Sequence, residues 1–115
     1  MPPRLFGIKN CDTVKKAKRW LEAQHIDFEF HDFRADGLTE PQVQAWIAQL
    51  GWEALLNKRS TTWRQLSDAD KQNLDDDTVT QLLCQHPTLI KRPVLQHEEA
   101  LLVGFKAETY QHCFN

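Results

Sequence analysis

The stretch Arg4-Leu5-Phe6-Gly7-Ile8-Lys9-Asn10-Cys11-Asp12 decides how this chain begins to fold. Its first half, Leu5 to Ile8, is a short apolar run of the kind found in buried parallel strands. From Thr13 to Gln24, apolar side chains recur at helical spacing, which predicts an amphipathic helix. Residues 26–33 then alternate between apolar and polar, which is the period of a strand. A strand, a helix and a strand in ~30 residues predict a parallel βαβ unit with a right-handed crossover.

The middle of the chain, from Leu38 to Gln85, is expected to be helical. Helix starts are predicted where a capping side chain precedes an apolar stripe, and helix ends where glycine or proline follows it. The expected elements are a helix from Thr39 to Gly51, a short turn over 52–56, a polar loop over 57–64, a short helix capped at 67–70, and a helix from Asp75 to His86.

Two further strands and a last helix are predicted near the C-terminus. Residues 93–95 and 100–103 are apolar and suit neighbouring strands, and residues 106–112 suit a helix. Sheet-forming segments therefore flank a helical segment, which predicts an α/β fold. We expect one domain over residues 1–115, with residues 38–86 as a helical insertion subdomain.

Composition and charge narrow the class of protein. The 115 residues suit one domain, and 14 basic against 16 acidic residues give a net charge of −2. This balance argues against nucleic-acid binding through phosphate neutralisation. The chain has no signal-peptide pattern and no apolar run near the ~18 residues of a membrane span. Cys11, Cys84 and Cys113 are odd in number and widely spaced, so they do not form a disulfide framework. We expect a cytoplasmic monomer that does not bind membranes.

Cys11 is the strongest candidate for chemistry. It falls where the first strand ends and the first helix begins, so its sulfur should meet unpaired amide N–H groups and the positive end of the helix dipole. Both favour the reactive thiolate, and Lys9 and Lys15 add positive potential. The alternative is a small buried residue without chemistry, since free cysteine is among the most buried residue types.

The sequence does not identify the thiol that would react with an oxidised Cys11. Position 14 is Val14, so the chain has no Cys-x-x-Cys pair. An oxidised Cys11 would have to be resolved by an external thiol such as glutathione, or by Cys84 or Cys113.

Two basic segments are further candidates. Arg92-Pro93 precedes an apolar strand, where the arginine could offer a planar double donor to a carboxylate or an oxyanion. A solvated surface arginine is the alternative. Residues 57–64 (NKRSTTWR) combine cations, hydroxyls and Trp63, which suits anion or peptide recognition, or else a polar loop anchored by the indole. The five histidines show no spacing typical of metal ligands, so no metal is expected.

Together these segments make the chain resemble the arsenate reductase (ArsC) family, and within it the branch that includes YffB and the Spx regulators. The resemblance spans nearly the whole chain in the right order. The matching segments are residues 5–13 (LFGIKNCDT), 57–64 (NKRSTTWR), 90–95 (IKRPVL) and 102–105 (LVGF).

The resemblance implies a thioredoxin-like fold with a mixed β-sheet and a helical insertion. It implies that Cys11 is the nucleophile, that Arg59 and Arg92 line one pocket, and that Pro93 is a cis-proline. In the reductases of this family, glutathione and glutaredoxin resolve the mixed species formed on the cysteine. The residues expected to bind substrate or glutathione are Lys9, Asn10, Arg59, Arg92 and Pro93.

The leading hypothesis is a glutathione-dependent thiol reductase without a bound cofactor, in which Cys11 attacks a disulfide or a glutathionylated substrate. Glutathione is the co-substrate, and glutaredoxin is a further partner. The first alternative is a non-enzymatic, Spx-like regulator that binds a protein. Arsenate reduction is the least favoured, because arsenate reductases of this family carry a third arginine near the position of Phe105.

Overall fold

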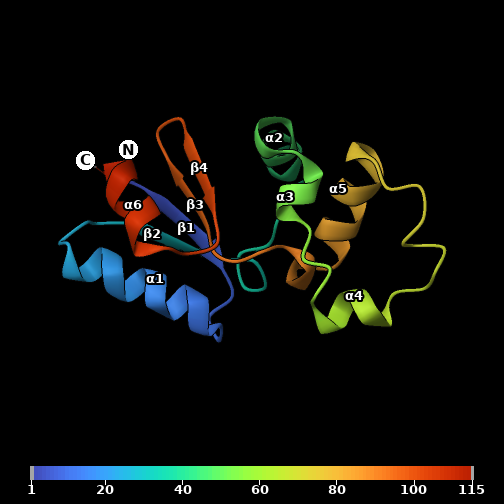
Figure 1. The fold of residues 1–115 in the computed structure, drawn as a ribbon, viewed down its shortest axis with the longest axis horizontal. Coiled ribbons are helices and arrows are strands. Elements are labelled where there is room, and N and C mark those ends of the chain that lie inside the picture. The colour runs from blue at the N-terminus through green and yellow to red at the C-terminus, as the bar shows by residue number, and fades with distance from the viewer. Residues whose placement is uncertain (1, 115) are drawn as a thin grey trace. The chain divides into compact units, whose positions relative to one another are not determined.

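The computed structural model describes residues 2–114 and divides the chain into two compact units. The sheet unit comprises Met1–Asp36 and Arg92–Asn115, and the helical unit comprises Gly37–Lys91 (Figure 1). The expectation that helices fill the middle of the chain agrees with this division. That the two units form one domain with an insertion at 38–86 stays a prediction. Within residues 2–114, no helix has the length and apolar character needed to cross a membrane.

The sheet unit contains the expected βαβ unit followed by a β-hairpin and a helix. Its four strands follow the order β2-β1-β3-β4. The first two strands pair in parallel, and the other pairs are antiparallel, so the predicted mixed sheet of an α/β fold is confirmed. The elements are β1 (Arg4–Gly7), α1 (Asp12–Ala23), β2 (Glu29–Asp32), β3 (Val94–His97), β4 (Ala100–Val103) and α6 (Ala107–Phe114).

One apolar row crosses all four strands of the sheet. Leu5 of β1 pairs with Phe30 of β2 on one side and with Leu95 of β3 on the other, and Leu95 pairs with Leu102 of β4. Paired residues of neighbouring strands point to the same face, so these side chains form one surface. Ala17 and Leu21 of α1 and Tyr110 of α6 join Leu5 and Leu95 in a fully buried cluster.

The helical unit is built from short helices around its own core. Thr39 caps the first helix, because its hydroxyl accepts a hydrogen bond from the backbone N–H of Gln42 (3.4 Å). Asp75 and Thr78 form a capping box at the start of the last helix, in agreement with the predicted start. The elements are α2 (Glu40–Leu50), α3 (Trp52–Leu55), α4 (Thr61–Gln65), α5 (Asp76–Gln85) and the 3₁₀ turn η1 (Pro87–Leu89).

Two predictions for the helical unit are wrong. The polar loop over 57–64 is helical in its second half, because the Ser60 hydroxyl caps α4 by accepting from the Trp63 N–H (3.1 Å). The short helix expected at 67–70 is absent. Ser67 does accept from the Asp70 N–H (3.2 Å), but only turns follow before α5. The segment lacks an apolar stripe, so a cap alone does not propagate a helix.

Candidate functional site around Cys11

Cys11 lies in the short connection between the end of β1 and the first turn of α1. It is the N-cap residue of α1, with an extended backbone (φ −113°, ψ 126°). Its carbonyl accepts the first helical hydrogen bond, from the Lys15 N–H (3.0 Å). The residue is half-buried. This is the strand–cysteine–helix junction that the sequence predicts.

The surroundings of the sulfur favour its charged form. Partial burial raises the pKa of Cys11, but the backbone N–H of Val14, the Arg92 guanidinium and the backbone N–H of Thr13 together outweigh burial and lower it. The sulfur makes no side-chain cap hydrogen bond of standard geometry, yet these donors lie close enough to stabilise a thiolate. Amide dipoles and one guanidinium thus act together on this atom.

Sheet pairing brings Arg92 to Cys11. Phe6 of β1 pairs with Val94 of the antiparallel β3, so the residues just before Val94 lie beside the residues that follow β1. Arg92 is half-buried there, and its guanidinium is among the groups that lower the pKa of Cys11. The Arg92–Pro93 peptide bond is cis, as the resemblance implies.

Lys9 and Asn10 are exposed in the turn before Cys11. The backbone N–H of Lys9 donates to a carboxylate oxygen of Asp32 (3.2 Å), which lies at the end of β2. Asp32 is absent from the candidates found in the sequence. The sequence could have indicated Asp32, because the carboxyl ends of the parallel strands β1 and β2 meet at one edge of the sheet. Ligand sites of open α/β sheets lie at the carboxyl ends of their strands. Contacts of Lys9 and Asn10 with a substrate stay predictions.

Arg59 belongs to the helical unit, where its side chain is exposed and its backbone N–H donates to the Asn57 side chain (3.0 Å). Cys11 and Arg92 belong to the sheet unit. Cys11 and Arg92 therefore lie in the same unit, whereas Arg59 lies in the other. That Arg59 joins Arg92 in one pocket stays a prediction.

The helical unit also carries a group of cations on indole rings, which we call the Trp63 cluster. The ammonium of Lys58 lies 5.7 Å from the Trp63 ring centroid and 5.9 Å from that of Trp52, and Lys71 lies 5.5 Å from Trp63. Trp63 is half-buried rather than fully exposed. Within residues 2–114, neither lysine forms an ion pair with a carboxylate.

The other two cysteines differ from Cys11 in their electrostatics. All three are free thiols. Burial raises the pKa of Cys84 in α5, with a further contribution from Glu40. Burial also raises the pKa of Cys113 in α6, with a contribution from Glu98. The pKa of Cys11 is lowered and those of Cys84 and Cys113 are raised, so Cys11 is the strongest candidate for a reactive thiol among residues 2–114. No group of metal-ligating side chains occurs among residues 2–114.

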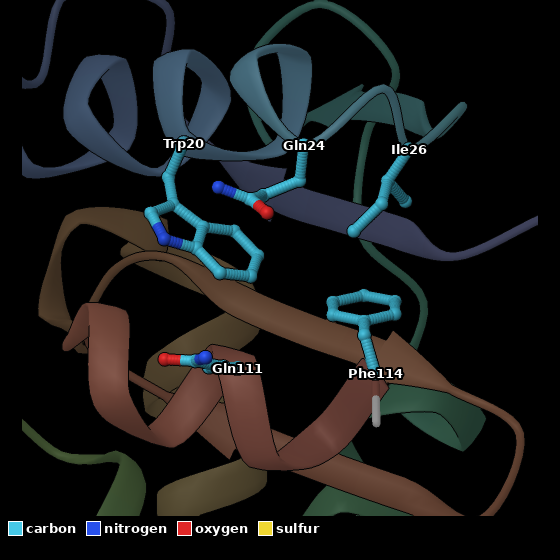
Figure 2. A pocket seen from close by; sticks show the side chains of 5 residues that line it. All are labelled: Trp20, Gln24, Ile26, Gln111 and Phe114. Atoms are coloured by element: carbon cyan, nitrogen blue, oxygen red, sulfur yellow. The ribbon is translucent and has the colours of Figure 1, made fainter.

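A hollow of about 310 Å³ lies at the far end of α1 from Cys11. Figure 2 shows its wall: Trp20, Gln24 and Ile26 on one side, and Gln111 and Phe114 of α6 on the other. With a rise of 1.5 Å per residue, Gln24 lies about 20 Å along the helix from Cys11. The hollow is therefore separate from the cysteine site.

Comparison with known proteins agrees with this architecture. The model of the ArsC family matches residues 6–113. The solved structure of a protein named YFFB superposes with a TM-score of 0.93, is 41% identical and covers 96% of each chain. An uncharacterised protein of Haemophilus influenzae is 46% identical over 110 residues, 96% of each chain. The "Global transcriptional regulator Spx" of Lactiplantibacillus plantarum is 26% identical over 106 residues, 90% of this chain and 80% of that protein.

Proposed function

The chain belongs to the ArsC family, and on this premise we propose that it is a cytoplasmic thiol reductase with Cys11 as nucleophile and glutathione as thiol co-substrate. The Cys11 thiolate attacks the glutathione-side sulfur of a glutathionylated substrate. Attack on the glutathione sulfur forms a Cys11–glutathione disulfide and releases the substrate as a thiolate, which takes a proton from water. A second glutathione thiolate then attacks that disulfide, so that oxidised glutathione leaves and the Cys11 thiolate returns.

The observation that carries this proposal is the contrast among the three cysteines. Only Cys11 has a lowered pKa, and the donors responsible are two helix amides and the guanidinium of Arg92. The thiolate is the attacking species in thiol–disulfide exchange. The chain has Val14 in place of a Cys-x-x-Cys partner, and the thiols of Cys84 and Cys113 have raised pKa values. An external thiol therefore completes the proposed cycle, supplied by glutathione or by glutaredoxin acting on the mixed disulfide.

The test is turnover of a glutathionylated peptide with reduced glutathione, followed through the release of oxidised glutathione. Cys11→Ser should abolish turnover. Cys84→Ser is the matched control, since it removes a thiol of raised pKa, and it should keep at least about half of the rate. Full turnover by Cys11→Ser would refute the proposal. So would turnover of arsenate with glutathione and none of the peptide.

A second candidate is a module that binds an acidic segment of a partner protein through the Trp63 cluster. Relatives named as Spx transcriptional regulators support this class of function. The cluster supports the chemistry: Lys58 and Lys71 present ammonium groups beside indole rings, with no carboxylate of residues 2–114 paired to them. Carboxylates of a partner would complement these charges, and its apolar side chains would pack on the indoles.

The test for this binding role uses a short peptide rich in Asp and Glu with aromatic residues, titrated against the protein and followed by backbone amide shifts. The double variant Lys58→Gln/Lys71→Gln should lose binding, whereas Lys15→Gln/Lys16→Gln, which removes the same charge from α1, should keep it. An equal loss of peptide affinity in both double variants would show general charge attraction and would refute this binding role. Preference for a single-stranded oligonucleotide over the peptide would end it as well.

A further inference from the structure

The carboxylate of Asp32 joins two loops at the edge of the sheet where Cys11 lies. One oxygen accepts from the backbone N–H groups of Arg34 (2.7 Å) and Ala35 (3.2 Å), in the loop after β2. The other oxygen accepts from the backbone N–H of Lys9 (3.2 Å), in the loop between β1 and α1. Three amide donors from two loops therefore converge on one side chain.

The backbone holds this carboxylate in register with the end of β1. Gly7 pairs directly with Asp32 in the parallel ladder, and the Phe33 N–H donates to the Gly7 carbonyl (2.9 Å). The N–H of Asp32 itself donates to the side chain of Asp36 (2.9 Å), which closes the loop after β2. The position of the Asp32 carboxylate thus follows from strand pairing and from its own loop.

The bond to Lys9 acts on the short segment that carries the nucleophile. Lys9 is two residues before Cys11, so fixing its amide leaves only Asn10 as a free link to the N-cap residue. The Cys11 sulfur needs close alignment to meet the amides of Thr13 and Val14. A segment tethered at residue 9 keeps that alignment at a smaller entropic cost than a free loop.

From these contacts we propose that Asp32 is a positioning residue for Cys11: its hydrogen bond to the Lys9 amide holds the loop that presents the sulfur to its donors. The inference rests on the proposed role of Cys11 as nucleophile. Asp32 does not act through its charge. A carboxylate near a thiolate disfavours it, and here three N–H groups already satisfy the carboxylate oxygens.

A charge role and a positioning role predict opposite changes in the alkylation rate of Cys11 when Asp32 is replaced. In Asp32→Asn, the side-chain oxygen can still accept from Arg34 and Ala35, but the amide nitrogen cannot accept from Lys9. If charge were the role of Asp32, its removal would favour the thiolate and speed alkylation of Cys11. If positioning is its role, the tether is lost, and the alkylation rate at pH 6.5 should fall about threefold to tenfold because the thiolate fraction falls. Exchange of the Lys9 amide proton should also accelerate.

Asp36→Asn is the matched control. It removes the same charge from the same loop, but the Asn oxygen can still accept the one bond from the Asp32 N–H. Its Cys11 alkylation profile should match the unmodified protein or shift to lower pH. Should Asp32→Asn fail to fold, Asp32→Glu tests the same tether with the charge retained, and it should also slow alkylation.

The outcomes separate this inference from the proposed function. A depressed Cys11 pKa in the unmodified protein, left unchanged or lowered further by Asp32→Asn, overturns the positioning role alone. An ordinary Cys11 pKa in the unmodified protein overturns the nucleophile itself, and the positioning role with it. A depressed pKa that rises in Asp32→Asn and not in Asp36→Asn supports both.

Discussion

Gly7 and Val14 approach so closely that a Cβ built on Gly7 would lie 2.7 Å from Cγ2 of Val14. Gly7 is the last residue of β1, and Val14 is a fully buried residue in the first turn of α1. The contact brings the start of the helix against the end of the strand. Cys11 lies on the connection between these two residues, so the close packing helps to set where its sulfur is held.

We expect Gly7→Ala to destabilise the protein by about 1–3 kcal/mol, because the added methyl group overpacks a closed contact. Urea unfolding measures this change. Val14→Ala should cost stability by itself, since it leaves a cavity. In the double variant the two costs should not add, because the shortened side chain makes room for the new methyl. Full additivity would show that the two residues do not compete for the same space.

The pH dependence of Cys11 alkylation should depend on Arg92. The pKa of Cys11 is lowered, with the guanidinium among the causes, so the thiolate forms below the ordinary cysteine value of about 8.5. Arg92→Gln removes the charge and should move the profile to higher pH. Arg92→Lys keeps the charge without the planar double donor and should give a smaller displacement. Identical profiles for all three proteins would contradict the contact.

Tyr110→Phe should leave stability unchanged or raise it by up to about 1 kcal/mol. The Tyr110 side chain is 0% exposed, and its hydroxyl has no hydrogen-bond partner within residues 2–114. Burial, with a smaller contribution from Cys113, raises the pKa of this phenol. Phe keeps the ring that packs edge-on against Trp20 (centroids 5.7 Å apart) and removes the unpaired group. A clear loss of stability in thermal unfolding would reveal a partner for the hydroxyl.

Asp75→Ala should lower the midpoint of thermal unfolding at pH 7, because it breaks the capping box of α5. The backbone N–H of Thr78, then its hydroxyl, lowers the pKa of Asp75. A carboxylate with a lowered folded pKa stabilises above its unfolded pKa, about 3.9, and that contribution is lost as the pH falls through the folded value. The difference between the two proteins should therefore shrink below pH 4. Asp77→Ala is a nearby control that leaves the capping box in place.

Much of the local structure follows from pattern alone. The spacing of apolar side chains predicts two elements: the helix from Asp12 to Ala23 and the strand from Glu29 to Asp32. The capping box at Asp75 and Thr78 is equally local. The two wrong predictions err in opposite directions. A cap at Ser67 without an apolar stripe does not make a helix, and Ser60 caps one where polar side chains suggested a loop.

The order of a strand, Cys11 and a helix can be predicted along the chain, because each depends on neighbours a few residues apart. The groups that surround the sulfur come from segments far apart in the chain and are brought together by strand pairing. Arg92 reaches the sulfur through the antiparallel pairing of β1 with β3, and Asp32 reaches the Lys9 amide through the parallel pairing of β1 with β2. Such contacts depend on strand register over many residues, and a one-residue slip would turn each side chain to the opposite face.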